Sequence, residues 1–139
     1  MHLLDTDTLT HLHADHPKVV ERLRALDDPD VGTTIITKIE LLRGRIDFLQ
    51  KAATGAELLR AQQFLVRTEE LLEQIVIVPF DTMAAAQFDQ LRANRSLRKI
   101  GRADLLIASI ALSKRATLVT RNVRHFKPVA GLKIVNWVD

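Results

Sequence analysis

The sequence predicts one α/β domain spanning residues 1–139, an α/β/α sandwich around a central, mainly parallel sheet of four to five strands. Short aliphatic and β-branched runs alternate along the chain with longer amphipathic segments, which is the pattern of βαβ units. Several strand-like runs are apolar throughout, as in a sheet covered on both faces. No internal repeat, low-complexity tract or Pro/Gly-rich linker divides the chain, and its length can bury a core.

The first half supplies two strands and four helices. Residues 2–5 (HLLD) predict a short buried strand that ends in a carboxylate, followed by helices at about 8–14 and 17–26. Pro17 suits the first turn of the second of these helices, where its missing N–H has no intrahelical partner to lose. The β-branched residues 31–36 (VGTTII) predict the second strand. Two long helices are then expected at 37–51, from the spacing of Ile39, Leu42, Ile46 and Leu49, and at 55–73.

The second half continues the alternation. Asp81 is well placed to cap a helix that runs to about residue 95. Residues 103–113 are apolar almost all round, so this helix is predicted to be the most buried one. The remaining strands are expected at 75–78 (IVIV), 116–120 (ATLVT) and 133–135 (KIV).

Composition excludes several functional classes. Apolar residues make up 47% of the chain and charged residues 27%, as in ordinary globular proteins. The longest apolar run is too short to cross a bilayer, and the chain starts without a secretory signal, so we expect a cytoplasmic protein with no membrane contact. The absence of cysteine excludes disulfides, thiolate metal sites and a cysteine nucleophile.

The net charge of +3 favours polyanionic partners only weakly. Five basic side chains nevertheless crowd one stretch. This stretch is either a solvated helix end and loop or a patch that contacts phosphate, and the sequence leaves both readings open. The residues are Arg92, Arg95, Arg98, Lys99 and Arg102.

Three carboxylates stand where parallel sheets bind ligands, at the carboxyl ends of the strands. Asp5 ends the first strand, Glu40 lies about one turn into the helix after the second strand, and Asp104 opens the buried helix. Each alone also fits a structural role: Asp5 as a helix cap, Asp104 at a helix N-terminus, Glu40 as an exposed helix residue. Together they are expected to meet at one edge of the sheet.

Such a group of acids predicts a metal site. Carboxylates gathered without basic neighbours repel one another and have raised pKa values, and a divalent cation removes that repulsion. Oxygen ligands favour Mg²⁺ or Mn²⁺. A hard cation activates water and stabilises charge on a phosphate, which predicts phosphodiester hydrolysis. The chain has no glycine-rich phosphate loop, which argues against a P-loop NTPase.

Four motifs in order resemble the PIN-domain family, and more narrowly the VapC-like toxins of toxin–antitoxin pairs, including the FitB-like branch. The resemblance extends to the closing GLKIVNW. The motifs are LLDTDTL at 3–9, TKIELLRG at 37–44, GRADLLIASIAL at 101–112 and LVTRNVRHF at 118–126.

The resemblance implies a PIN fold and a Mg²⁺- or Mn²⁺-dependent endoribonuclease that acts on RNA. It also implies a homodimer and a small cognate antitoxin whose C-terminal segment occupies the active-site groove, with DNA contacted only through the antitoxin complex. The family's first three acids fall on Asp5, Glu40 and Asp104, as catalytic residues and metal ligands.

The chain departs from the family at the fourth acidic position, which falls on Asn122 or on His125. We assign it to Asn122, which offers a carbonyl oxygen but no charge, so a second metal should be weaker or absent. His125 is a phosphate contact or, as lone loop histidines usually are, a structural or exposed residue. Asp7 is an extra acid near Asp5, which either supplies some of the missing negative charge or, as we expect, caps the first helix.

Two other functions compete with a nuclease toxin. A DNA-binding regulatory subunit with weak or no nuclease activity would fit the missing acid, although the chain shows no helix-turn-helix. A phosphoacceptor receiver domain also gathers acids at strand ends, but it needs a lysine after a late strand, where this chain has Thr120, Arg121 and Asn122.

The two long helices carry more apolar surface than a sheet of this size needs. Large apolar patches usually mark interaction sites, so these helices predict a protein interface, either with a second copy or with the antitoxin. The residues concerned include Phe48, Leu59, Phe64 and Leu71.

Overall fold

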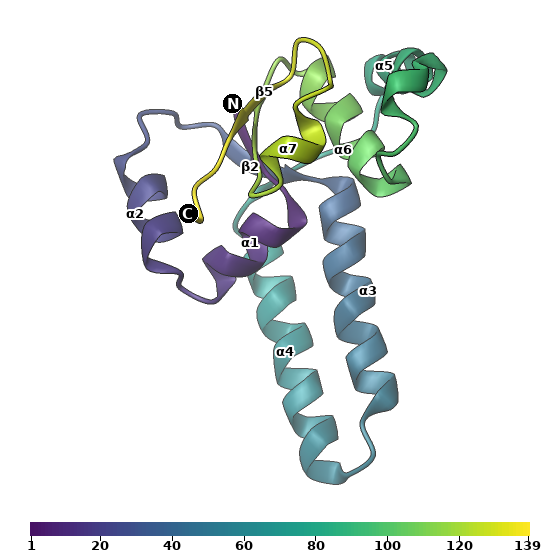
Figure 1. Ribbon diagram of the computed structural model, residues 1–139. Coiled ribbons are helices and arrows are strands. Elements are labelled where there is room, and N and C mark those ends of the chain that lie inside the picture. The colour runs from purple at the N-terminus through teal and green to yellow at the C-terminus, as the bar shows by residue number, and fades with distance from the viewer.

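A computed structural model describes all residues 1–139. Its centre is a five-stranded sheet in the order β3-β2-β1-β4-β5, with every neighbouring pair parallel (Figure 1). The predicted fold class is therefore confirmed, with five strands. The strands are β1 (His2–Leu4), β2 (Val31–Thr34), β3 (Val76–Val78), β4 (Thr117–Val119) and β5 (Lys133–Val135).

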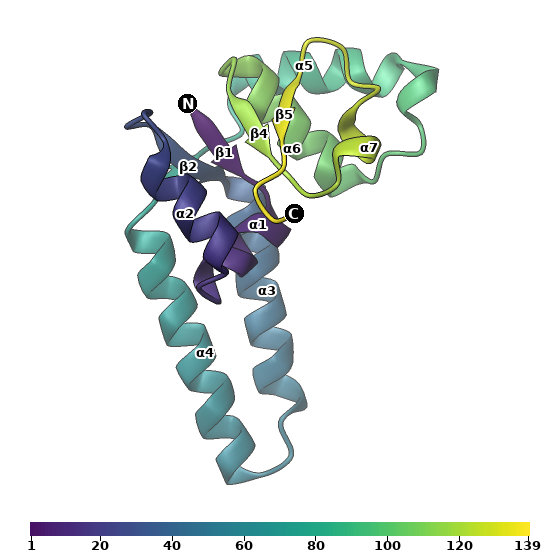
Figure 2. The same cartoon turned by 60° about the vertical axis from the view of Figure 1, so that its left-hand side comes forward.

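Helices cover both faces of the sheet (Figure 2). None of them is long and apolar enough to cross a membrane. A short 3₁₀ turn at Arg95–Leu97 follows the fifth helix. The helices are α1 (Thr6–His13), α2 (Pro17–Ala25), α3 (Ile35–Lys51), α4 (Gly55–Glu73), α5 (Thr82–Ala93), α6 (Arg102–Ser113) and α7 (Val123–Phe126).

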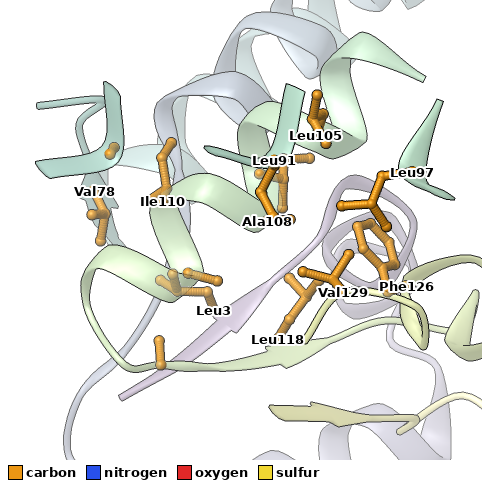
Figure 3. Packing of buried hydrophobic residues seen from close by; sticks show 14 residues of the cluster. Leu3, Val78, Leu91, Leu97, Leu105, Ala108, Ile110, Leu118, Phe126 and Val129 are labelled. Atoms are coloured by element: carbon orange, nitrogen blue, oxygen red, sulfur yellow. The ribbon is translucent and has the colours of Figure 1, made fainter. Parts of the chain in front are cut away.

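Adjacent residues of the central strands pack into two different hydrophobic cores, because side chains alternate between the faces of a sheet. Leu3 and Leu118 belong to a cluster with α5, α6 and α7, and this cluster also contains Phe126 (Figure 3). Leu4 and Val119 belong to a second cluster with α1 to α4. Uniformly apolar strands therefore did indicate a sheet covered on both faces.

Helix α6 is the most buried helix, as predicted. Six of its twelve residues are buried, and the hydroxyl of Ser109 donates to the carbonyl oxygen of Leu105 at 2.7 Å, so the polar group in its buried stretch is satisfied. This helix lies against the sheet and holds Asp104 in its first turn. A buried helix fixes the position of that carboxylate firmly.

Several predicted bounds were wrong, and capping residues explain two of them. The Asp5 carboxylate accepts from the N–H of Thr8, so α1 begins at Thr6 and not at about residue 8. The hydroxyl of Thr34 accepts from the N–H of Thr37 and starts α3 immediately, so Ile35 and Ile36 are helical although they are β-branched. The helix predicted to run to 95 ends at Ala93.

The α3–α4 hairpin projects away from the rest of the molecule (Figures 1 and 2). The bounds 55–73 of α4 were predicted correctly. The apolar stripes on the two helices, however, do not all face the core: Ile39 and Ile46 are each 44% exposed, and Leu58 is 45% exposed. Their spacing marked an amphipathic face correctly, but much of that face meets solvent.

Candidate active site

A cleft of about 470 Å³ opens at the carboxyl-terminal edge of the sheet. It receives residues from the end of β1, from α3, from the start of α6 and from the segment after β4. All four predicted catalytic residues line it. The lining residues are Asp5, Thr6, Asp7, Glu40, Asp104, Arg121, Asn122 and Phe126.

Asp5 is buried at the junction of β1 and α1. One carboxylate oxygen accepts from the N–H of Thr8 at 2.8 Å, and the hydroxyl of Thr8 donates to the carbonyl oxygen of Val119 at 3.1 Å. Burial raises the pKa of Asp5, bonds from Thr120 and Thr8 oppose that shift, and the charge of Asp7 adds to it. Ionising the Asp5 carboxyl group is therefore unfavourable unless a cation lies nearby.

Glu40 is held by a threonine from the first motif. The Thr6 hydroxyl donates to Oε1 of Glu40 at 2.6 Å and lies 3.2 Å from the hydroxyl of Thr37. Because Thr6 immediately follows Asp5, this bond ties the second carboxylate to the chain segment that carries the first.

Asp104 is paired with His125, whose Nε2 lies 3.2 Å from Oδ2 of Asp104. Burial raises the pKa of Asp104; the charge of His125 lowers it, and the charges of Glu40 and Asp5 raise it further. The three predicted carboxylates are therefore close enough to act on one another electrostatically.

The donor chemistry of the cleft fits a hard divalent cation, because its candidate ligands are carboxylate and amide oxygens. No group of three acidic or histidine side chains is arranged to hold an ion in the present conformations. Oε1 of Glu40 is turned onto Thr6 and Oδ2 of Asp104 onto His125. Each of these two carboxylates has a second oxygen that could contact a cation in the cleft.

Residues 2–132 match the family described as the PIN domain. This chain is a PIN-domain protein. It is 26% identical over 137 residues to the tRNA(fMet)-specific endonuclease VapC of Salmonella typhimurium, covering 97% of this chain and 96% of that relative. The resemblance noted in the sequence is therefore confirmed, and the receiver-domain alternative is excluded.

Solved structures agree with this assignment. VapBC2 of Rickettsia felis bound to a DNA fragment from its promoter superposes with a TM-score of 0.81 at 26% identity, covering 98% of each chain. FitAB bound to a DNA fragment gives a TM-score of 0.78 at 26% identity, covering 100% of this chain and 96% of that one. This PIN domain thus resembles the toxin chains of both the VapBC and the FitAB complexes.

In this PIN domain the segment after β4 brings both candidates for the fourth position close to the acids. Asn122 lines the cleft, and its backbone N–H donates to the Thr120 hydroxyl at 3.0 Å. His125 lies on α7, which the sequence did not predict, and contacts Asp104 instead. The assignment of the fourth position to Asn122 stays a prediction.

The expected role of Asp7 was wrong. Asp5 is the N-cap of α1, and Asp7 lies in the first turn of that helix. The Asp7 side chain is exposed at the cleft, and its carboxylate lies 3.7 Å from Nδ1 of His11. Only one residue can be the N-cap of a helix, and two aspartates separated by one threonine did not reveal in the sequence which of them it would be.

The basic stretch at 92–102 does not line the cleft. Arg92, Arg98 and Arg102 border a separate hollow of about 230 Å³ beside α5 and α6, and the Arg102 guanidinium lies 5.7 Å from the centre of the Phe88 ring. The cation in the cleft is Arg121, which sequence reasoning missed although it directly precedes Asn122.

Proposed function

We propose that this PIN-domain chain is the toxin of a toxin–antitoxin pair, a metal-dependent endoribonuclease that hydrolyses RNA phosphodiester bonds in the cytoplasm. The observation that carries the proposal is the cleft lined by Asp5, Glu40 and Asp104, which come from three separate elements of the fold. The VapC relative named above is an endonuclease specific for a tRNA, and that name supports RNA as the substrate.

In this proposal Asp5, Glu40 and Asp104 hold Mg²⁺ or Mn²⁺. The bound cation supplies an activated water and stabilises negative charge on the phosphate. The raised pKa values of Asp5 and Asp104 support this role, since a cation restores the ionised state that burial disfavours. Asn122 occupies the fourth position with a neutral oxygen.

Two threonines near the cleft orient these acids. Thr6 fixes one oxygen of Glu40, and the N–H of Thr8 fixes one oxygen of Asp5. Hydrogen bonds to ligating carboxylates commonly orient metal ligands, and their loss typically lowers metal affinity or activity about 10–100-fold. Thr6 is therefore a positioning residue, and Thr6→Val should weaken metal binding without removing a ligand.

The partners in this proposal are a small cognate antitoxin and a second copy of the chain. The VapBC2 and FitAB structures named above are both complexes bound to DNA fragments, which supports DNA contact through such a complex rather than through this chain alone. The exposed apolar side chains of the α3–α4 hairpin offer a surface for such an interface. They include Ile46 and Phe48 on α3, and Leu58, Leu59 and Val66 on α4.

A second candidate is a regulatory subunit of a DNA-bound complex with weak or no nuclease activity. The neutral Asn122 at the fourth position favours it, because one fewer carboxylate lowers metal affinity. It predicts that the purified chain cleaves RNA poorly at every metal concentration.

Cleavage of defined RNAs by the purified chain tests both candidates. Reactions with Mg²⁺, Mn²⁺ or EDTA should show cleavage only with metal, and Asp5→Asn should abolish it. Asp89→Asn, an exposed acid on α5, is the matched control. Cleavage that resists EDTA and survives Asp5→Asn would refute the metal mechanism, whereas no cleavage by the wild type with either metal favours the regulatory subunit.

A further inference from the structure

Arg121 is the one cationic side chain among the residues that line the acidic cleft. Arg121 lies two residues after the end of β4. It is therefore at the same edge of the sheet as Asp5, which follows the end of β1. Four of the other lining residues are carboxylates: Asp5, Asp7, Glu40 and Asp104.

The Arg121 guanidinium is held along one edge by the side chain of Asp139. Nε and Nη2 of Arg121 each donate to a different carboxylate oxygen of Asp139, both at 3.2 Å. Asn136 also donates to Asp139, at 2.9 Å, and together these bonds lower the pKa of Asp139, which keeps it an anion at neutral pH. Arg121 is therefore oriented by a partner that is itself anchored.

This arrangement leaves part of the guanidinium free. A guanidinium carries five N–H donors, and a bidentate pair through Nε and Nη2 uses two of them. The Nη1 group and the second N–H of Nη2 remain, and these form a second edge of the same planar fork. The Arg121 side chain is 53% exposed and lines the cleft, so it is accessible to a ligand there.

We propose that Arg121 binds a phosphate of the RNA backbone in the cleft, and that Asp139 positions its guanidinium for this contact. The proposal rests on the proposed function, because it concerns the substrate of that same cleft. Four carboxylates repel a polyanion, so an RNA strand entering the cleft needs a positive anchor beyond the metal. The planar fork of arginine fits phosphate oxygens in the way that it fits a carboxylate.

The alternative ligand for the free edge is an acidic segment of a protein partner. Arg121 lines the same cleft as Asp5, Glu40 and Asp104, to which the proposed reaction brings a backbone phosphate, and this favours the substrate phosphate as its ligand. Unchanged RNA binding without Arg121 would point to the protein ligand and overturn the proposal.

Fluorescence anisotropy with a labelled single-stranded RNA of mixed sequence tests the proposal in EDTA, where cleavage does not interfere. Arg121→Gln should weaken binding about tenfold, as expected for the loss of a charged hydrogen-bonded contact. The plot of log K against log salt should become shallower by about 0.7, the value for one phosphate contact on a single strand. Arg121→Lys keeps the charge but not the fork, and should bind with intermediate affinity.

Arg115→Gln is the matched control, because Arg115 is an exposed arginine at the opposite end of β4. It should leave both affinity and salt slope unchanged. Asp139→Asn should weaken RNA binding less than Arg121→Gln does. Tighter binding by Asp139→Asn would mean that Asp139 competes with phosphate, and would overturn its positioning role.

The outcomes separate this proposal from the nuclease function. A wild type that cleaves RNA while Arg121→Gln keeps its KM, affinity and salt slope overturns the Arg121 proposal alone. A wild type that binds RNA through Arg121 but cleaves nothing with Mg²⁺ or Mn²⁺ overturns the nuclease alone. A wild type that neither binds nor cleaves RNA overturns both.

Discussion

The acidic cleft and the projecting α3–α4 hairpin both contain side chains in unfavourable surroundings. In the cleft these side chains are buried carboxylates, and on the hairpin they are apolar side chains exposed to solvent. The cleft concentrates carboxylates whose burial raises the pKa values of Asp5 and Asp104. The hairpin exposes apolar side chains such as Leu59, which is 63% exposed. A bound cation would relieve the repulsion among the cleft acids, and a protein surface would cover the apolar side chains of the hairpin. If both proposals hold, this small domain separates its chemistry, in the cleft, from its protein contacts on the hairpin.

Asp104→Asn should produce the largest effect, and only at the cleft. Removing one of the three proposed carboxylate ligands should lower RNA cleavage by at least about 100-fold. The melting temperature of the metal-free protein should not fall, because a neutral amide replaces a carboxyl group that burial makes hard to ionise. Cleavage assays and thermal melts in EDTA measure the two effects.

The exposed acid Asp47 on α3 provides the control for this prediction. Asp47→Asn removes the same charge from the hairpin and should keep full activity. Equal losses of RNA cleavage in Asp104→Asn and Asp47→Asn would contradict the claim that the catalytic acids lie only in the cleft.

Substitutions of two leucines on α4 should change the free energy of unfolding by very different amounts, because one leucine is buried and the other is exposed. Leu72 is 5% exposed and belongs to the second core cluster, so Leu72→Ala should lower the free energy of unfolding by about 2–5 kcal/mol. Leu59→Ala should change it by no more than about 0.5 kcal/mol. Urea denaturation measures both changes, with RNA cleavage of the folded Leu59→Ala protein expected to stay normal.

The interface role of the hairpin has its own test. Leu59→Glu should weaken self-association in sedimentation experiments while the stability of the monomer stays unchanged. A wild type that sediments as a monomer at tens of micromolar would contradict the homodimer, since no surface of the hairpin would then be covered by a second copy.

The sequence predicted the cleft better than it predicted the burial of the hairpin. Asp5 and Asp104 could be placed because strand ends and helix starts are local features, and parallel strands bring such ends to one edge. The exposure of Ile39 and Ile46 could not be predicted, because periodicity reveals an apolar face but not whether this chain or another one covers it.

The sequence also did not predict contacts between distant segments of the chain. The bond from Thr6 to Glu40 spans 34 positions, and the pair of Arg121 with Asp139 spans 18. Neither follows from spacing or composition, because each depends on how the sheet is ordered. Helix α7 was also missed, since four residues are too few to show helical periodicity.

The dependence of stability on pH should separate the cleft from other acids. The folded-state pKa values of Asp5 and Asp104 are raised above 3.8, so protonation favours the folded state. Their contribution therefore makes the metal-free protein more stable as pH falls from neutral toward 3.8. Asp28 acts in the opposite direction, because its bond with His2 lowers its pKa to about 2, and its stabilising contribution is lost between about 3.8 and 2.

Thermal melts in EDTA across this range test the pH dependence. The gain between neutral pH and about 4 should shrink in Asp104→Asn and should vanish when saturating Mn²⁺ holds the cleft acids ionised. Asp28→Asn should leave this gain intact and remove part of the loss below 3.8. An identical pH profile for wild type and Asp104→Asn would show that the cleft acids are not under electrostatic strain.

A last prediction concerns the family's fourth acidic position. Asn122→Asp adds a carboxylate to the cleft, and affinity for hard cations rises with the number of carboxylates. A metal affinity about tenfold higher would add about 1.4 kcal/mol to the metal-induced gain in stability at saturation. Without metal the same variant should be slightly less stable than the wild type, because the new charge repels Asp104 and Asp5.

His125→Asp is the competing variant, because His125 already touches Asp104 at 3.2 Å. Replacing that imidazole by a carboxylate removes a partner of Asp104 and places a second acid beside it, so the metal-free protein should lose more stability than Asn122→Asp does. Thermal melts with a Mn²⁺ titration compare the two. If His125→Asp increases the metal-induced shift and Asn122→Asp leaves it unchanged, then residue 125 holds the fourth position, and the assignment of that position to Asn122 is wrong.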